Sequence, residues 1–329
     1  MKTSQLTVGT TPPVVVSHVR KTNKKSQVMN ATQKANRRAR VAGGYVTLPT
    51  VKPSRVAESF YRRAMTAEIE RMLASMQAQI KQVYTTIPVQ NAPETPAQRL
   101  ARLRKILERL RKQYGNKLNR NAERIIKKYM QKARDEMNGN ARKQYSKEFG
   151  TAFTIQFDGQ KYGRILKIRA TTNAELIRNT TSQIVSNVTN ITYDGVTTGQ
   201  TWRAVEKTLA TQKHIARDRI KRIARDQTAK LNESLNQLQQ EDAGVKFFEW
   251  STANDERVST GYGGHKQLEG KIYKWGDTAN YPIIDSYGHR GLPAQRVNCR
   301  CTALPVILRK DYTAQQTADG DWIITNGRL

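Results

Sequence analysis

Cysteine is scarce in this chain: Cys299 and Cys301 are the only two among 329 residues. Two cysteines in a chain of this length do not make a disulfide framework, which excludes the disulfide-rich secreted class. Long apolar runs are missing as well. The longest, residues 303–308, is strand-sized and far short of the ~20 residues that a membrane-spanning helix needs. The first residues lack the apolar core of a secretory signal. We therefore expect synthesis in a reducing cytoplasm and no membrane partner.

Acidic residues are also scarce, with 27 Asp and Glu against 57 Lys and Arg and a net charge of +30. So large an excess repels itself unless counterions or a partner neutralise it. Nucleic acid is the usual partner, because each phosphate contact releases condensed counterions. Hydrophobic residues make up only 37% of the chain, below the usual range. Much of the chain should therefore be extended, helical or partner-bound, and its length predicts about two domains.

Residues 1–53 contain ten basic residues and no acidic ones, and they show no apolar periodicity. Pro12–Pro13 and Gly43–Gly44 interrupt any regular element. This composition is typical of a basic extended arm that is disordered in isolation and becomes ordered only against a partner. DNA phosphates are the expected partner of the basic side chains in this arm, among them Arg20, Lys21, Lys24, Lys25, Arg37, Arg38 and Arg40.

A basic helical region is predicted over residues 54–150. Ser54 is a candidate N-cap, and apolar residues then recur every three or four positions up to Pro88, which ends the first helix. Similar stripes predict a second helix around residues 100–110 and a third over residues 121–149. The second and third helices are strongly basic.

Fourteen basic residues and only two acidic ones lie between Arg99 and Arg134. Pairs of opposite charge three or four residues apart would support a solvated helix face, but two glutamates cannot pair with fourteen bases. The shortage favours contact with a DNA backbone or an acidic protein surface. The candidate DNA-contacting residues of this region are Arg102, Arg104, Lys105, Arg109, Arg111 and Lys112.

The second half of the chain is predicted as a compact domain over residues 151–310, followed by a C-terminal tail over residues 311–329. Its pattern indicates a short strand at 151–157, helices at 173–190, 201–209 and 214–242, and strands at 245–250, 271–275 and 299–308. In the tail, an Asp-Gly-Asp turn precedes a short hairpin. The expected fold is α+β, with a mainly helical N-terminal region that carries the basic arm. The compact C-terminal domain consists of helices on a small antiparallel sheet.

Four short motifs follow one another in this second half. They are, in order, Arg225, Thr228 and Asn232 on a helix, Asp255-x-Arg257, His265-x-x-Leu268-x-Gly270, and Asn298-Cys299-Arg300-Cys301. In this order and spacing they resemble the Mu F-like head-morphogenesis family of tailed bacteriophages, over roughly residues 165–308. The chain departs from the family at Arg296–Val297, where many members have His-Pro. The loop at 258–264 also carries extra glycines and lacks the usual second arginine.

The resemblance implies a minor capsid protein, present in few copies and acting at the portal vertex in head assembly and in genome packaging or ejection. The implied partners are the portal protein, the major capsid or scaffolding protein, and packaged double-stranded DNA. The implied location is the capsid interior near the portal vertex, after synthesis in the cytoplasm of the bacterial host. The family is not one of enzymes. The basic arm and helices would touch DNA phosphates, which carry no sequence information.

The two cysteines are candidate metal ligands. On a strand, Cys299 and Cys301 point to the same face, and two thiolates favour zinc over harder metals. A full site would need His265 and one further ligand, either His289 or Asp255. The alternative is that both cysteines are small buried residues of a core strand with the histidine hydrogen-bonded nearby. We expect no cofactor, and zinc is the metal that this set of residues would take.

Catalysis is weakly supported by the same residues. Asp255 and His265 could form an acid–base pair, but the chain has no Cys-x-x-Cys with His-x-Glu and no clustered carboxylates of a two-metal nuclease. The glycines at 261–264 lack the Lys-Ser/Thr end of a phosphate loop. We therefore expect no catalytic residues and no enzyme. Two alternatives stay open: a metal-dependent nuclease or toxin-like effector, and a free sequence-independent nucleic-acid-binding protein.

Overall fold

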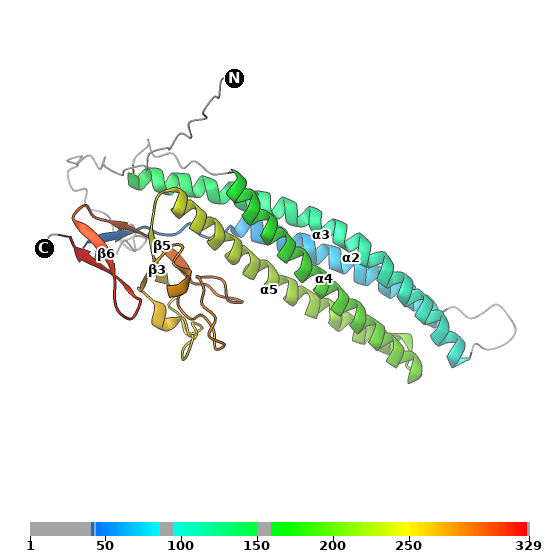
Figure 1. Ribbon diagram of the computed structural model, residues 1–329. Coiled ribbons are helices and arrows are strands. Elements are labelled where there is room, and N and C mark those ends of the chain that lie inside the picture. The colour runs from blue at the N-terminus through cyan, green and yellow to red at the C-terminus, as the bar shows by residue number, and fades with distance from the viewer. Residues whose placement is uncertain (1–40, 43, 86–94, 150–158, 328–329) are drawn as a thin grey trace, which may run out of the picture.

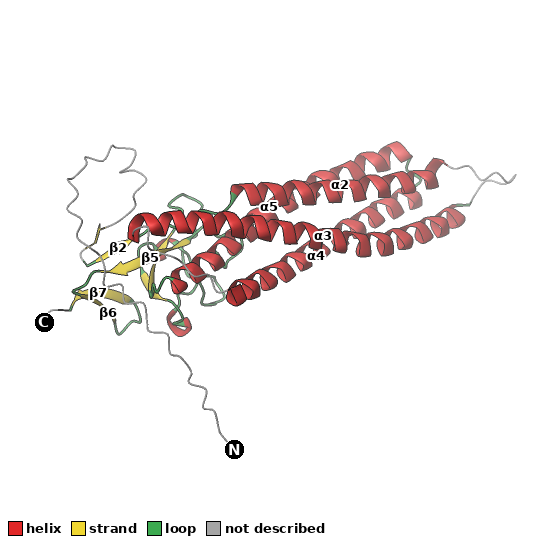
Figure 2. Cartoon of the chain, turned by 90° about the horizontal axis from the view of Figure 1, so that it is seen from above, coloured by secondary structure: helices red, strands yellow, loops and turns green. Residues whose placement is uncertain are grey.

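The computed structural model describes residues 41–42, 44–85, 95–149 and 159–327. Four long helices form most of it: α2 (Arg55–Thr85), α3 (Pro96–Phe149), α4 (Gly159–Thr197) and α5 (Trp202–Asp242). They lie side by side in an elongated bundle, and the strands gather at one end of it (Figure 1; Figure 2). The α+β class predicted from the sequence is therefore confirmed.

The helices form where the apolar spacing predicts them, and local capping fixes two of their starts. Ser54 accepts a hydrogen bond at its Oγ from the backbone N–H of Ala57, which confirms the predicted N-cap of α2. Thr201 caps α5 in the same way through the N–H of Ala204. The structure corrects the number of helices. The predicted second and third helices are one continuous α3, and the helices predicted at 201–209 and 214–242 are one continuous α5 (Trp202–Asp242).

A shared core joins the four helices on both sides of residue 150, the position expected to separate two domains. Buried apolar residues of one cluster run from Leu48 to Leu238. At its centre the rings of Tyr61 and Tyr129 stack with centroids 4.6 Å apart. The Tyr61 hydroxyl donates to Asn173 Oδ1 at 2.9 Å on α4. The core thus contains polar contacts that fix how the helices align.

Within the described residues, the sheet has seven antiparallel strands in the order β1-β2-β5-β3-β4-β7-β6. Their bounds are β1 (Val41–Ala42), β2 (Tyr45–Thr47), β3 (Phe247–Ser251), β4 (Ile272–Lys274), β5 (Thr302–Leu308), β6 (Tyr312–Gln316) and β7 (Trp322–Asn326). Two short 3-10 helices, η1 (Lys266–Leu268) and η2 (Thr278–Asn280), lie in the loops between strands. The predicted hairpin of the tail is confirmed as β6 and β7, which extend the same sheet.

The arm prediction is wrong at its C-terminal end. Residues 45–47 form β2 and pair with residues 306–308 of β5, and Leu48 and Val51 are only 4% and 3% exposed. These residues belong to the folded core, because β2 satisfies backbone groups on one side of β5. The sequence did not show this, since three strand residues are too few to reveal a period. Residues 1–40 and the predicted strand at 151–157 lie outside the described residues.

Helix α5 changes character where the sheet packs against it. Its first half buries mainly apolar side chains, with Gln212 as the polar one, whereas beyond Ala224 most of the buried side chains are polar. Three of them bind the free edge of β5: Asn236 and Gln240 donate to the Ala303 carbonyl at 3.0 and 2.9 Å, and Glu233 Oε1 accepts from the Ala303 N–H at 2.9 Å. Strand β2 pairs only with the later residues of β5. The side chains of α5 therefore satisfy the backbone that the sheet leaves open.

Candidate functional site

The motif residues meet where the loops around β5 lie against the middle of α5. The first contact is an ion pair between Arg300 and Asp255, whose two nitrogen–oxygen distances are both 2.6 Å. Arg257 also donates to Asp255, from its backbone N–H at 3.1 Å and its guanidinium at 3.2 Å. The Arg300 guanidinium, and then Arg257, hold the pKa of Asp255 well below its usual range. A bidentate pair of this kind fixes the geometry of the loop.

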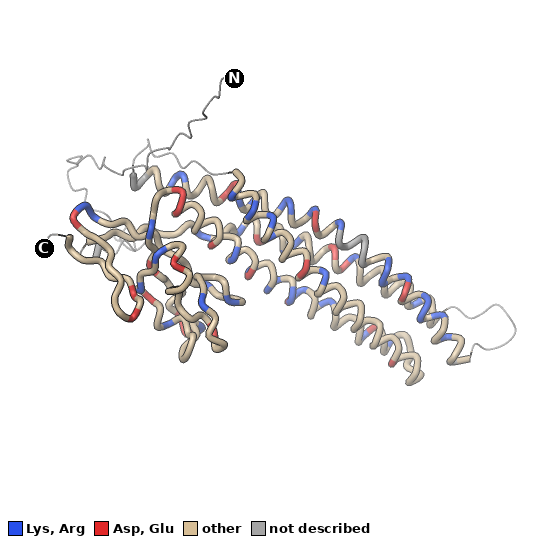
Figure 3. Tube along the Cα trace, viewed as in Figure 1, with Lys and Arg blue, Asp and Glu red and all other residues tan. Residues whose placement is uncertain are grey.

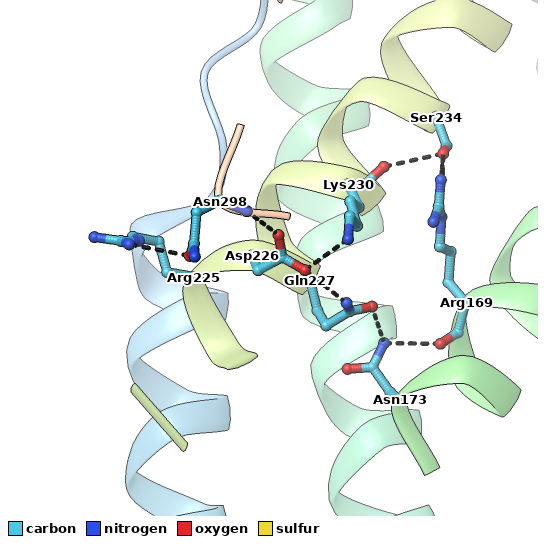
Figure 4. A network of polar contacts seen from close by, with 8 residues as sticks. All are labelled: Arg169, Asn173, Arg225, Asp226, Gln227, Lys230, Ser234 and Asn298. Carbon is cyan, nitrogen blue, oxygen red and sulfur yellow. Dashed lines mark hydrogen bonds and ion pairs between the residues drawn. The ribbon is translucent and has the colours of Figure 1, made fainter. Parts of the chain in front are cut away.

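Asn298 connects the loop to α5. Its φ of 59° lies in the left-handed region, which asparagine adopts more readily than most residues. Its side-chain Oδ1 accepts from Arg225 at 3.1 Å, and its backbone N–H donates to Asp226 Oδ1 at 2.7 Å. The turn before the cysteines is therefore attached to two successive residues of the helix (Figure 4).

Asp226 continues this connection into the bundle. Its Oδ2 forms an ion pair with Lys230 at 2.8 Å and accepts from Gln227 at 2.9 Å. Gln227 in turn accepts from Asn173 of α4 at 3.3 Å. The close-up shows this path running from the loop across α5 to α4 (Figure 4). Because these groups are buried and paired, the network holds the loop in one position relative to the helices.

The other motif residues on α5 and near β4 also make internal contacts. Thr228 accepts a hydrogen bond from the buried Tyr129 hydroxyl at 3.1 Å, and Asn232 donates to the Val51 carbonyl at 3.0 Å. Gly270 has a φ of 78° and donates its N–H to the Trp250 carbonyl at 2.8 Å. A residue with a Cβ would be strained at this φ, since only glycine adopts it freely. These three positions hold the backbone in place.

His265, Cys299 and Cys301 form a buried cluster beside this frame. The Nδ1 atom of His265 lies 3.3 Å from Cys299 Sγ and 3.4 Å from Cys301 Sγ. Its Nε2 lies 3.0 Å from the Ile284 carbonyl oxygen, and its ring meets the Trp250 ring edge-on, with centroids 5.4 Å apart. Both cysteines are free thiols. The structure thus brings together three of the four predicted metal ligands.

The fourth predicted ligand lies elsewhere. His289 is exposed and pairs with Asp285 at 2.8 Å, so the structure corrects its placement in the cluster. Asp255, the alternative fourth ligand, is taken by Arg300. Asp255 and His265 do not form the acid–base pair considered from the sequence. The ring of His265 contacts the two thiols and the Ile284 carbonyl, and its backbone N–H donates to Ser259.

The three side chains influence one another's protonation. The Cys301 thiol, and then the His265 ring, lower the pKa of Cys299 in spite of its burial. The Cys299 sulfur, together with burial, raises the pKa of Cys301. Burial works to lower the pKa of His265, but its contact with Cys299 outweighs burial and leaves that pKa above its usual value. Of the two thiols, Cys299 is therefore the one that loses its proton first.

A cavity of about 220 Å³ adjoins the cluster. Both cysteines and His265 line it, together with residues of the neighbouring loops: Ala253, Arg257, Val258, Ser259, Arg296, Val297, Asn298 and Arg300. A larger cavity of about 700 Å³ lies between α3 and α4, with an apolar floor that includes Met130 and Leu166. None of the motif residues lines this second cavity. The small cavity, with its three arginines, is the one that belongs to the site.

The candidate DNA-contacting residues fall into two sets. The seven in the arm, Arg20 to Arg40, lie outside the described residues. Of the six on α3, Arg102 donates to the Val83 carbonyl at 2.9 Å and Arg104 donates to the Tyr193 hydroxyl at 3.0 Å. The remaining four are exposed and form no ion pair within the described part of the chain: Lys105, Arg109, Arg111 and Lys112. Lys and Arg recur along the bundle helices (Figure 3).

Asp226 and Glu233 are the site residues that the sequence analysis did not single out. Asp226 stands next to Arg225 inside the helical motif, and the lysine four residues later is the sequence signal that could have identified it as half of an ion pair. Glu233 gave no signal, because its partner Ala303 is seventy residues away. Burial raises the pKa of Glu233 to about 8.

The elongated helical bundle and the antiparallel sheet at one end of it make this a helix-rich α+β protein, and its motif residues make internal contacts. Residues 186–304 match the model of the family described as Phage Mu protein F like protein. The resemblance found from the motifs is thereby confirmed over this segment. The matched segment contains α5, the strands β3 and β4, and the motif residues from Arg225 to Cys301.

An uncharacterized protein of Haemophilus influenzae is 34% identical to this chain over 147 residues, which are 43% of this chain. The chain spans only 30% of the length of that relative. No solved structure matches the chain significantly. Among the described residues, no helix combines the length and the apolar character that crossing a membrane requires.

Proposed function

We propose that this chain is a minor head protein of a tailed bacteriophage that works at the portal vertex, inside the capsid, in head assembly and in genome packaging or ejection. The family match supports the head role. The observation that carries the proposal further is the engagement of the motif residues. Asp255, Arg300 and Asn298 brace loops against α5, and a braced, non-reacting motif suits a protein that presents a surface to a partner.

The loops that this frame supports expose large apolar side chains. Tyr262, Tyr287 and Val297 are 69%, 86% and 70% exposed, and the Tyr262 hydroxyl lies next to Gly288. Tyrosines with few rotatable bonds are enriched at protein interfaces, where they act as anchors. We assign the portal contact to these loops. The major capsid or scaffolding protein remains a further partner that the resemblance implies.

Co-expression with the portal protein of the same phage tests this assignment. We expect the wild-type chain to co-purify with the portal protein and the Tyr262→Ser/Tyr287→Ser double variant to lose at least tenfold in affinity, because hot-spot aromatics each contribute about 2 kcal/mol or more. Val56→Ser is the matched control, since Val56 is 64% exposed but lies on α2. Equal retention of the double variant and the control would reject the loops as the contact.

The exposed bases of α3 support contact with packaged DNA. Lys105, Arg109, Arg111 and Lys112 are free to meet phosphates, which would give sequence-independent binding. Replacing all four with glutamine should lower the slope of log affinity against log salt by up to about 3.6, because each phosphate contact contributes about 0.9. Binding to short duplexes of several sequences, measured by fluorescence anisotropy at several salt concentrations, decides this. An unchanged slope would exclude this surface.

The place of the protein in the particle is tested independently. Cryo-electron microscopy of the phage head without imposed icosahedral symmetry should show density for the elongated bundle next to the portal. Density elsewhere on the shell, or none in mature and immature heads, would contradict the proposal.

A further inference from the structure

We propose that His265, Cys299 and Cys301 bind one Zn²⁺ ion, with the fourth coordination position directed into the adjoining cavity and completed by water. The three side chains come from two segments more than thirty residues apart. Their ligand atoms nevertheless all lie within 4.8 Å of one another. Among the described residues, no other His, Cys, Asp or Glu joins this group, so the protein supplies three ligands.

The hydrogen bond on the far side of the ring determines which nitrogen is free. A backbone carbonyl only accepts hydrogen bonds, so Nε2 of His265 must carry the proton that it donates to Ile284 at 3.0 Å. In the neutral ring, Nδ1 then presents its lone pair to both sulfurs. A carbonyl that orients the imidazole in this way is the usual support of a metal-binding histidine.

Two thiols converge on this one lone pair. A single in-plane lone pair accepts one S–H proton well, yet Cys299 at 3.3 Å and Cys301 at 3.4 Å lie almost equally close to it. A cation between the three atoms uses both sulfurs and the nitrogen at once. Two thiolates also neutralise a divalent ion, so the nearby Arg296 and Arg300 meet no net positive charge at the cluster.

The spacing fits zinc. With Zn–S near 2.3 Å and Zn–N near 2.0–2.1 Å, tetrahedral angles place sulfur and nitrogen about 3.6 Å apart. The two sulfur–nitrogen distances of 3.3 and 3.4 Å need only a small outward movement to reach this value. One residue between the cysteines is less than the common spacing of structural zinc sites, and the open side toward the cavity accommodates that tighter arrangement.

Metal content is the first test. Full-length protein, purified under reducing conditions without chelator, should contain about one zinc per chain when its metal content is measured by inductively coupled plasma mass spectrometry. The Cys299→Ser/Cys301→Ser variant should lose it, while His289→Gln, whose histidine pairs with Asp285 outside the cluster, should keep it. Loss of zinc in the His289→Gln variant would overturn the assignment of ligands.

A second test needs no variant, so it holds even where the serine variant fails to fold. Wild-type protein stripped with a chelator and titrated with Co²⁺ should show thiolate-to-cobalt charge transfer and the visible bands of tetrahedral cobalt. X-ray absorption of the zinc form should show two sulfur ligands. A folded, reduced protein that takes up neither Zn²⁺ nor Co²⁺, or zinc with only nitrogen and oxygen ligands, would overturn the proposal.

Discussion

The bundle and the loop–sheet end of this molecule are built in different ways. In the bundle, apolar side chains recur at helical spacing and one hydrophobic core runs through α2, α3, α4 and α5. At the other end, a second and smaller buried cluster around Trp250 is accompanied by a polar network from Asn298 through Asp226 to Asn173. Buried apolar surface stabilises the bundle, whereas a few buried polar contacts fix the position of the loops.

A chain that begins at residue 54 should show the largest effect, because it lacks residues 41–53, the segment that joins the two regions. The deletion removes β2 and the buried Leu48 and Val51, and fully burying such a side chain contributes about 1.5–3 kcal/mol. We expect the free energy of unfolding to fall by about 3–6 kcal/mol in urea titrations. A chain that begins at residue 41 is the control. A mild effect of the longer deletion would show that β2 is dispensable.

Asp226→Ala should come next and should act on the loop end. It leaves Lys230, whose side chain is 13% exposed, without its ion-pair partner, and an uncompensated buried charge costs about 3–5 kcal/mol. Asp226→Asn is the matched control, since it keeps an acceptor for the Asn298 N–H. Hydrogen exchange should show faster exchange in residues 293–301 with α2 unchanged. Equal loss of protection in both regions would erase the distinction between them.

These two regions also differ in how far the sequence could predict them. Spacing of three and four predicted the helices, and Ser54 predicted the start of α2 correctly. Prediction from the sequence failed where an element was too short to show a period, or where two partners were too far apart in the sequence. Strand β2 has three residues, and Arg300 meets Asp255 across 45 positions. The cysteines and His265, which chemistry marks as potential ligands, could be placed together from sequence alone, but His289 was placed wrongly with them.

Glu233→Gln should reduce the pH dependence of the protein's stability. In the folded chain the pKa of Glu233 is raised to about 8 by burial, so its stabilising contribution is complete below its unfolded pKa and is lost as pH rises toward 8. Each unit of the rise corresponds to about 1.4 kcal/mol. Melting temperatures between pH 5 and 8 should fall less for the variant than for the wild type. Parallel curves would show that Glu233 stays ionised.

Substitutions of Asn298 should have the smallest effect and should separate backbone from side chain. Asn298→Ala loses the contacts of the side chain with Arg225 and strains the φ of 59°, a combined cost of about 1–2 kcal/mol. Asn298→Gly keeps the backbone free and loses only the hydrogen bond. Thermal melting should therefore rank wild type above glycine and glycine above alanine. Alanine equal to glycine would mean that the backbone conformation carries no cost.

The antiparallel pairing of β2 with β5 also determines how this molecule responds to mechanical force. In the described part of the chain, Tyr45, Val46 and Thr47 pair with β5, and Gly44 and Leu48 add one backbone hydrogen bond each, with Arg309 and Pro305. Strand β1 beyond them has two residues. A pull on the chain ahead of residue 41 loads these few hydrogen bonds one after another, whereas the helices behind them share a core that must be pulled apart as a whole. We therefore expect the edge of the sheet to yield at a lower force than the bundle.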